Sequence, residues 1–174
     1  MTSPLRPREM LATLEAHRVR YVLIGGLAAV LHGSPTVTSD ADVCPERSDD
    51  NLDRLATALR EMNARIRTTA EPDGLDFACD AAFLWQMKMV NLTTDFGDFD
   101  ISFEPAGFTG YAELMKNAVD VPIGVTSVSV ASLADVIRSK ETANRPKDHA
   151  TLPILKALQD EIAGREARSE EPGE

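Results

Sequence analysis

The chain has 174 residues, a length that fits one domain with a sizeable hydrophobic core. Its net charge is −10, from 18 Lys and Arg residues against 28 Asp and Glu residues, which disfavours indiscriminate binding to nucleic acid. No apolar run approaches the roughly 20 residues of a membrane span, and the first ten residues lack the apolar core of a secretion signal. The composition therefore predicts a cytoplasmic globular protein with no membrane partner, in which Cys44 and Cys79 are reduced thiols.

Helical and strand patterns alternate along the chain. From apolar spacing and from capping and breaking residues, helices are expected at 7–18, 27–33, 48–63, 108–119, 132–143 and roughly 147–168. Strands are expected at 41–45, 64–68, 85–94, 96–104 and 125–132, preceded by a strand of four or five residues within 21–26. This interleaving predicts an α/β (α+β) domain with a mixed β-sheet flanked by helices. We expect one domain over residues 1–165, with a C-terminal helical part at about 131–165, followed by an acidic flexible tail at 166–174.

Two carboxylates lie two positions apart at the start of one expected strand. Asp40 and Asp42 flank a single alanine, and side chains two apart in a strand point to the same side. Carboxylates placed so close repel one another unless a cation compensates them. Mg²⁺ binds a few carboxylates and fills its remaining positions with water and phosphate oxygens. Asp40 and Asp42 are therefore candidate ligands of a divalent cation.

A third carboxylate is expected from a later strand. Apolar and polar side chains alternate there, with Phe99, Ile101 and Phe103 on one face and Asp98, Asp100 and Ser102 on the other. Either Asp98 or Asp100 can supply the carboxylate, and we favour Asp100 because Gly97-Asp98 is typical of a turn. Three carboxylates suit a two-metal site, in which one ion activates a hydroxyl and the other neutralises a leaving pyrophosphate.

Two adjacent glycines, Gly25 and Gly26, interrupt the apolar run at 21–33, where a strand passes into a helix. A glycine pair at such a turn lets backbone N–H groups approach a phosphate, and the start of the helix favours the negative charge. An ordinary tight turn is the alternative explanation. Together with the downstream acids, the glycines indicate a pocket for a nucleoside triphosphate.

Two stretches of the chain resemble a known family. GGLAAVLHGSPTVTSDADV (25–43) resembles the signature of the nucleotidyltransferase superfamily, which has the polymerase-beta-like fold. VASLADVIRSKETANRPKDHATLPIL (130–155) is similar to the segment after the catalytic core in bacterial nucleotidyltransferases of the AbiEii/MenT type, many of them toxins of type IV toxin–antitoxin systems. The resemblance implies that Asp40, Asp42 and Asp100 are catalytic and bind Mg²⁺ or Mn²⁺, with a nucleoside triphosphate as substrate.

The resemblance also implies which residues bind the nucleotide. Gly25 and Gly26 match the glycines of the phosphate-binding turn. Four residues match a basic segment of the subgroup: Lys140, Arg145, Lys147 and Asp148. Lys140 or Lys147 would hold triphosphate oxygens, and Asp148 would orient one of these lysines. Favourable cations at the end of a helix are the alternative explanation of this segment.

The implied activity is transfer of a nucleoside monophosphate from a nucleoside triphosphate to an acceptor hydroxyl. In the toxin group the acceptor is the 3′ end of tRNA, and a cognate antitoxin protein is an expected partner. A tRNA would need a positive track, for which the candidates are Arg60, Arg65, Arg67, Arg138, Arg145 and Lys147. The alternatives are transfer to a protein or to a small, aminoglycoside-like hydroxyl compound, and a catalytically silent nucleotide-binding module. Three retained acids that repel one another argue against the silent module.

Overall fold

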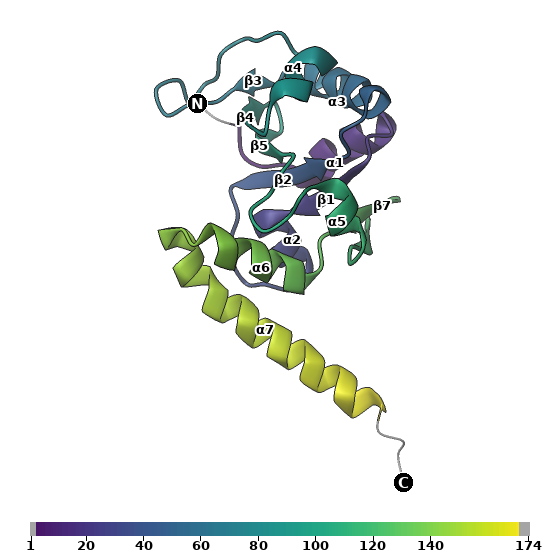
Figure 1. Ribbon diagram of the computed structural model, residues 1–174, viewed down its shortest axis with the longest axis vertical. Coiled ribbons are helices and arrows are strands. Elements are labelled where there is room, and N and C mark those ends of the chain that lie inside the picture. The colour runs from purple at the N-terminus through teal and green to yellow at the C-terminus, as the bar shows by residue number, and fades with distance from the viewer. Residues whose placement is uncertain (1–2, 171–174) are drawn as a thin grey trace.

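The computed structural model describes residues 3–170 and shows one mixed sheet flanked by helices (Figure 1). The helices are α1 (Pro7–Ala16), α2 (Gly25–Leu31), α3 (Asp49–Glu61), α4 (Ala81–Gln86), α5 (Tyr111–Met115), α6 (Leu133–Ala143) and α7 (Pro146–Glu170). The strands are β1 (Tyr21–Ile24), β2 (Asp40–Pro45), β3 (Arg65–Ile66), β4 (Met89–Thr94), β5 (Gly97–Ser102), β6 (Val119–Ile123) and β7 (Thr126–Val130). The predicted α/β domain with a mixed sheet is confirmed.

The seven strands lie in the order β3-β4-β5-β2-β1-β7-β6. The sheet is mixed because β2 pairs with β5, and β1 with β7, in parallel, whereas the other neighbours are antiparallel. Strand β2 has β1 on one side and β5 on the other, so that Asp42 lies opposite both Ile24 and Asp100. The register therefore brings together three segments that are far apart in the sequence.

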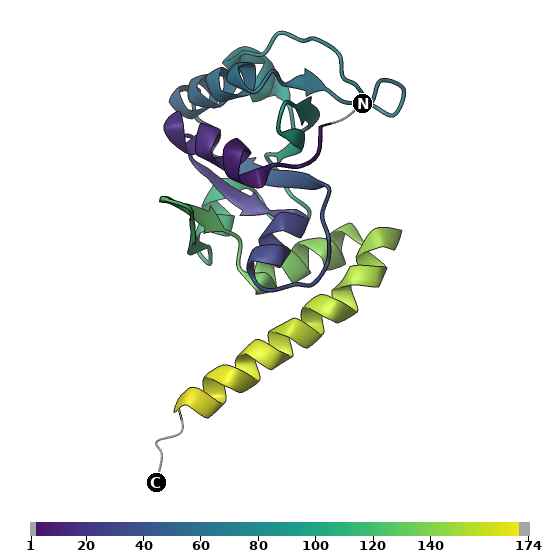
Figure 2. The same ribbon diagram turned by 180° about the vertical axis from the view of Figure 1, so that it is seen from behind.

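Apolar residues on alternate positions of the strands build the core. In β5, Phe99 and Ile101 are fully buried, whereas Asp98 and Asp100 are only partly buried, as the alternation predicts. Helices α1 and α3 lie side by side (Figure 2) and bury leucines such as Leu14. Each fully buried side chain of this size stabilises the fold by about 1.5–3 kcal/mol.

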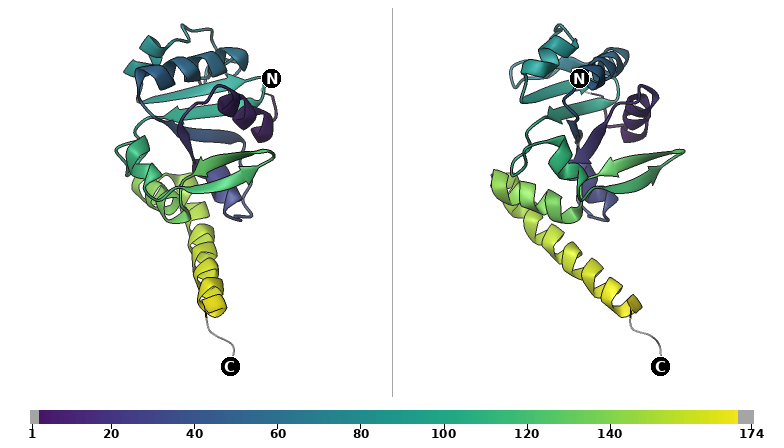
Figure 3. Two further views of the ribbon diagram at one scale, coloured as in Figure 1. Left: turned by 90° about the vertical axis from the view of Figure 1, so that its right-hand side faces the viewer. Right: turned by 45° about the vertical axis from the view of Figure 1, so that its right-hand side comes forward.

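Helix α6 packs against α2 and contributes buried residues to the core, and α7 packs against α6. Ser132 begins α6 as predicted, since its Oγ accepts a hydrogen bond of 3.1 Å from the backbone N–H of Asp135. Asn144 ends α6 in the left-handed conformation (φ +50°), which lets the chain reverse into α7. Leu155 is buried, but most of α7 extends away from the sheet (Figures 1 and 3).

Three segments differ from the sequence-based expectations. The expected tail at 166–174 is helical as far as Glu170, and 171–174 lie outside the described residues. The expected strand at 85–94 begins only at Met89, because Asp80 caps α4 by accepting a 2.8 Å hydrogen bond from the N–H of Phe83. The expected helix at 108–119 ends at Met115, and β6 follows it.

No helix within residues 3–170 is both long and apolar enough to cross a membrane.

Candidate active site

The glycine pair lies directly against the acidic strand. Gly25 begins α2 immediately after β1, with φ +68°, a conformation that favours glycine. A Cβ atom at Gly25 would lie 2.4 Å from Oδ2 of Asp42, and one at Gly26 would lie 2.8 Å from Oγ1 of Thr38. Gly25 therefore brings the backbone close to the Asp42 carboxylate, and Gly26 brings it close to the Thr38 hydroxyl, with no room for a side chain at either position.

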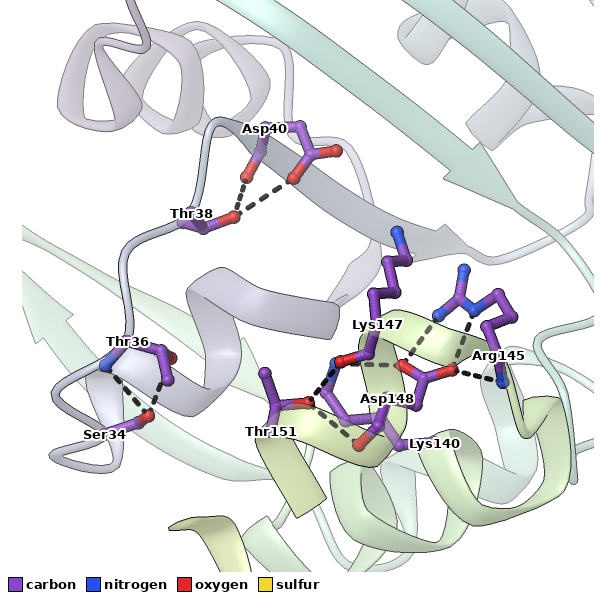
Figure 4. A network of polar contacts seen from close by, with 9 residues as sticks. All are labelled: Ser34, Thr36, Thr38, Asp40, Lys140, Arg145, Lys147, Asp148 and Thr151. Atoms are coloured by element: carbon purple, nitrogen blue, oxygen red, sulfur yellow. Dashed lines mark hydrogen bonds and ion pairs between the residues drawn. The ribbon is translucent and has the colours of Figure 1, made fainter. Parts of the chain in front are cut away.

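Four carboxylates lie on one face of two neighbouring strands. In the parallel pair of β2 and β5, Asp40 lies opposite Asp98 and Asp42 lies opposite Asp100. Paired residues of adjacent strands point to the same side of a sheet, so all four side chains share that face. The hydroxyl of Thr38 lies 3.0 Å from both the carbonyl oxygen and Oδ1 of Asp40 (Figure 4).

The acid groups of this face carry more negative charge than their surroundings compensate. Burial, followed by the charges of Asp40 and Asp100, raises the pKa of Asp42 to about 7. Lys147 and Lys140 act in the opposite direction but do not cancel these effects. A hard cation stabilises such a group of partly buried carboxylates.

Arg67 binds the two acids of β5. Its Nη2 donates a 2.8 Å hydrogen bond to Oδ1 of Asp100, and its Nε lies 3.3 Å from Oδ2 of Asp98. Burial still raises the pKa of Asp100, against the opposing effect of Arg67. In the sequence, Arg67 stands out only as a candidate of the nucleic-acid track, because no local pattern connects it with acids more than 30 positions away.

The residues fit a divalent cation at the Asp40–Asp42 pair. Hard cations take oxygen ligands, and two carboxylates leave positions for water and phosphate oxygens. Among residues 3–170, no group of three carboxylate, histidine or cysteine side chains is arranged to hold a metal ion. Asp100 is instead held by Arg67, so its role as a third metal ligand stays a prediction.

A basic segment at the junction of α6 and α7 is organised around Asp148. This carboxylate is fully buried and accepts hydrogen bonds from the backbone N–H (3.1 Å) and the guanidinium (2.8 and 3.3 Å) of Arg145. The Nζ of Lys140 lies 3.4 Å from it. Burial alone would raise the pKa of Asp148, but the hydrogen bonds and charges of Arg145 and Lys140 outweigh it, and the pKa lies below its ordinary value. Lys147 extends instead toward β2 (Figure 4).

One cavity of about 270 Å³ gathers most of the residues selected from the sequence. Its lining includes Gly25, Gly26, Asp40, Asp42, Lys140, Arg145 and Lys147. Six further residues complete the lining: Ala29, Thr36, Val37, Thr38, Thr151 and Leu155. They lie within the stretches 25–43 and 130–155, but their residue types do not by themselves indicate a site. Asp148 and Asp100 are not part of the lining.

The six residues of the expected nucleic-acid track do not all carry a free charge. Four of them form ion pairs with acids: Arg65, Arg67, Arg138 and Arg145. Arg60 donates to the carbonyl oxygen of Cys79. Local compensation of this kind reduces the attraction that these residues would exert on a phosphate backbone.

The mixed sheet, with a glycine turn beside an acidic strand and a helical basic segment, has the fold of nucleotidyltransferases. The lincosamide antibiotic adenylyltransferase LnuA, with lincomycin bound, superposes with a TM-score of 0.60 at 14% identity, over 90% of this chain and 99% of that chain. TM1012 of Thermotoga maritima, described as a nucleotidyltransferase, gives 0.52 at 18% identity, over 91% and 97%. The antibiotic-resistance factor ANT(2″)-Ia gives 0.50 at 13% identity, over 93% and 91%.

Sequence comparisons add nothing to these structural ones. Comparison with protein-family models finds no match, and comparison with curated proteins finds none at a significant level. The structural likeness therefore establishes a fold shared with nucleotidyltransferases. Membership of the AbiEii/MenT toxin group stays a prediction.

Proposed function

We propose that this protein is a metal-dependent nucleotidyltransferase, which transfers a nucleoside monophosphate from a nucleoside triphosphate to an acceptor hydroxyl. One observation carries the proposal: a single cavity has the Asp40–Asp42 pair and the glycine turn on one wall and Lys140, Arg145 and Lys147 on another. A triphosphate with its cation combines the two charges that these walls would attract.

The basic wall and the glycine turn bind the triphosphate. Lys147 and Lys140 reach phosphate oxygens, and Arg145 adds a planar group with several N–H donors. Backbone N–H groups at Gly25 and Gly26 approach the same oxygens without a side chain between them. A divalent cation held by Asp40 and Asp42 supplies neutralisation of the charge on the reacting phosphate and on the leaving pyrophosphate.

Asp100 accepts the proton of the acceptor. The acceptor oxygen forms a bond to the α-phosphorus, the bond from that phosphorus to the pyrophosphate oxygen breaks, and the hydroxyl proton passes to the Asp100 carboxylate. The raised pKa of this carboxyl makes it a better base than an exposed aspartate. Asp100 lies opposite Asp42 in the sheet, on the strand next to the cation site.

Two acceptors have support of different kinds. The sequence resemblance favours the 3′ end of tRNA, which would make the protein a type IV toxin with a cognate antitoxin. The fold neighbours LnuA and ANT(2″)-Ia, an antibiotic adenylyltransferase and an antibiotic-resistance factor, favour a small hydroxylated molecule. The ion pairs of the four arginines also favour the small acceptor, because they leave a weaker positive track for RNA.

A labelling experiment tests the activity and separates the acceptors. The wild type and Asp42→Asn are incubated with Mg²⁺ and each of the four α-labelled nucleoside triphosphates. Parallel reactions contain total tRNA, a panel of aminoglycosides and lincosamides, or no added acceptor, the last to detect transfer to protein. We expect label in one class of product with the wild type and none with Asp42→Asn.

A second measurement covers the case of an acceptor missing from the panel. Because a ligand that binds only the folded state raises its melting temperature, Mg²⁺ with nucleotide should stabilise the wild type more than Asp42→Asn. No labelled product together with equal stabilisation of the two proteins would overturn the proposal.

A further inference from the structure

Arg67 is the cation that the structure places among the acids of β5. Its guanidinium reaches Oδ1 of Asp100 with Nη2 (2.8 Å) and Oδ2 of Asp98 with Nε (3.3 Å). The Arg67 side chain is 26% exposed, and the two carboxylates are 20–21% exposed, so solvent screens this bridge only in part. The Nε–H donates to the carbonyl oxygen of Leu92 (3.4 Å), so Arg67 holds Asp100 by a hydrogen bond and Asp98 by charge alone. A planar guanidinium with fixed N–H directions allows this combination, and an ammonium group does not.

The bridge leaves the two acids in different states. Oδ1 of Asp98 is buried without a hydrogen-bond partner among the described residues, and Oδ2 faces Arg67. Oδ2 is therefore the one oxygen of Asp98 that a substrate could reach, and the charge of Arg67 neutralises it. Asp100 accepts the hydrogen bond from Arg67 at Oδ1 only. Within residues 3–170, no hydrogen bond reaches its Oδ2, and Oδ2 is not one of the fully buried oxygens that lack a partner. The second oxygen of Asp100 is therefore open to an incoming group.

Arg67 also borders an open cavity on the β3–β4–β5 side of the sheet. Arg67, Thr68, Thr69, Pro72, Asn91 and Asp98 line this space of about 580 Å³. It shares no lining residue with the cavity that holds the glycine turn and the basic wall. A molecule that entered it would meet Arg67 and Asp98 first and would reach Asp100, which is not part of the lining, past the guanidinium.

We infer that Arg67 is a positioning residue for the transfer reaction: it holds Asp100 by one oxygen, presents the other to an acceptor that approaches along the β3–β4–β5 side, and withdraws Asp98 from the chemistry. This inference rests on the proposed function. It assigns Asp100, rather than Asp98, as the third functional carboxylate. Two properties of Arg67 would then matter and can be tested separately: its positive charge and its bridging geometry.

Three variants test the charge and the bridging geometry separately. Arg67→Met removes the charge and the bridge, Arg67→Lys keeps the charge without the planar guanidinium, and Arg54→Met is the matched control. Arg54 lies on α3 outside the expected nucleic-acid track, pairs with Asp50, which is 61% exposed, and lines neither cavity. Binding of Mn²⁺ is measured by titration with and without nucleoside triphosphate, kcat and KM are measured with the acceptor that the labelling experiment finds, and thermal melting checks folding.

The expected changes in metal binding and turnover have opposite signs. In Arg67→Met, loss of a nearby positive charge should tighten Mn²⁺ binding at least about fivefold. The same change should lower kcat at least about tenfold with little effect on KM for the nucleotide, because Asp100 is no longer held. Arg67→Lys should restore the wild-type Mn²⁺ affinity but only part of kcat, and Arg54→Met should match the wild type in both.

The results that contradict the inference are distinct from those that contradict the function. If the wild type binds Mn²⁺ and Arg67→Met binds it equally well, Arg67 does not act on the acids, and this measurement decides even without a known acceptor. A parallel loss of metal binding and turnover in Arg67→Met would equally reduce Arg67 to a structural role. A wild type that neither binds Mn²⁺ nor transfers label contradicts the proposed function itself.

Discussion

The two walls of the main cavity treat a buried carboxylate in opposite ways. On the sheet wall, Asp42 faces Asp40 and Asp100, and its pKa is raised to about 7. On the helical wall, Asp148 is more deeply buried, yet its pKa lies below the ordinary value because Arg145 and Lys140 surround it. Burial alone therefore does not decide how easily a carboxyl group is ionised; its partners do.

This difference in pKa indicates different roles for the two acids: a structural role for Asp148 and a ligand-binding role for Asp42. The charge of Asp148 is compensated within the protein, so Asp148 fixes the basic segment and has no need of a further cation. The charge of Asp42 is not compensated, so a divalent cation bound there, as we propose, would lower the free energy of the folded state. The experiments below test this contrast, from the largest expected effect to the smallest.

Asp42→Asn should abolish transfer and leave the fold intact. Loss of a cation ligand removes charge stabilisation at the reacting phosphate, and we expect kcat to fall by about a thousandfold or more. The melting temperature without metal should stay equal or rise, because the substitution relieves repulsion among the acids. Transfer assays and thermal melting check both parts. If Asp42→Asn keeps its activity or unfolds more readily than the wild type, Asp42 does not have the ligand-binding role that distinguishes it from Asp148.

Asp148→Asn should have the opposite profile, with stability as its main loss. Arg145 and Lys140 would lose their shared acceptor, and we expect unfolding to become easier by about 2–3 kcal/mol, less than for a fully buried pair because the Arg145 side chain is 52% exposed. Chemical denaturation measures this difference. Binding of nucleotide should weaken as a secondary effect, since the basic segment is less well fixed.

Gly25→Ala should impair both stability and transfer. The backbone has φ +68°, and the new Cβ would lie 2.4 Å from Oδ2 of Asp42, so the carboxylate or the turn must move. We expect a loss of about 1–3 kcal/mol in stability, together with weaker Mn²⁺ binding.

Gly164→Ala is the matched control for this change. Gly164 lies within α7, and a Cβ there would meet nothing within 4 Å, so alanine should be neutral or stabilise the helix by up to about 1 kcal/mol. Equal effects of the two substitutions would show that the close approach at Gly25 has no role.

The stability of the two walls should depend on pH with opposite signs. A raised pKa means that folded Asp42 binds a proton more tightly than the unfolded chain, so its contribution to stability falls as the pH rises from about 4 to about 7. A lowered pKa means that the contribution of Asp148 is present above about pH 4 and is lost as the pH falls below it.

Denaturation in metal-free buffer, compared between the wild type and each Asp→Asn variant, measures these two slopes. The difference between the wild type and Asp42→Asn should shift against the wild type as the pH rises. The difference between the wild type and Asp148→Asn should shrink in acid. Slopes of the same sign would contradict the contrast.

Thr38→Val should give the smallest effect. It removes the hydroxyl that lies 3.0 Å from Oδ1 of Asp40 and keeps the shape of the side chain. We expect a change of about 0.5–1.5 kcal/mol, seen as a severalfold weaker Mn²⁺ affinity with an unchanged melting temperature. Unchanged metal binding would mean that Thr38 does not orient Asp40.

The parts of the site that the sequence predicts are local. Asp40 and Asp42 share a face because of strand alternation, and the glycine pair marks the turn into α2. Both patterns span a few residues, where backbone geometry fixes side-chain direction. Asp98 and Asp100 share a face for the same local reason, because they alternate with Phe99 and Ile101. The parallel pairing of β2 with β5 then places this face beside Asp40 and Asp42.

The remaining parts depend on contacts between distant segments. Arg67 meets Asp100 only because β3 and β4 add to the sheet beside β5. The segment around Trp85 has the apolar character of a strand, yet the Asp80 cap begins a helix there. The pattern at 108–119 predicts a helix that includes Val119, but pairing with β7 makes Val119 a strand residue. Tertiary contacts of this kind override local preference.

The sheet and the α6–α7 junction each supply one wall of the main cavity, so the two walls become available at different times during synthesis of the chain. Asp40 and Asp42 are synthesised about a hundred residues before Lys140, Arg145 and Lys147. At ribosomal rates of roughly 5–20 residues per second, this interval lasts about 5–20 seconds. A growing chain that ends before residue 140 carries the glycines and the acids but none of the three cations. Under the proposed function, such a chain would lack the basic wall for a triphosphate, and the capacity for transfer would arise only when synthesis has passed the start of α7.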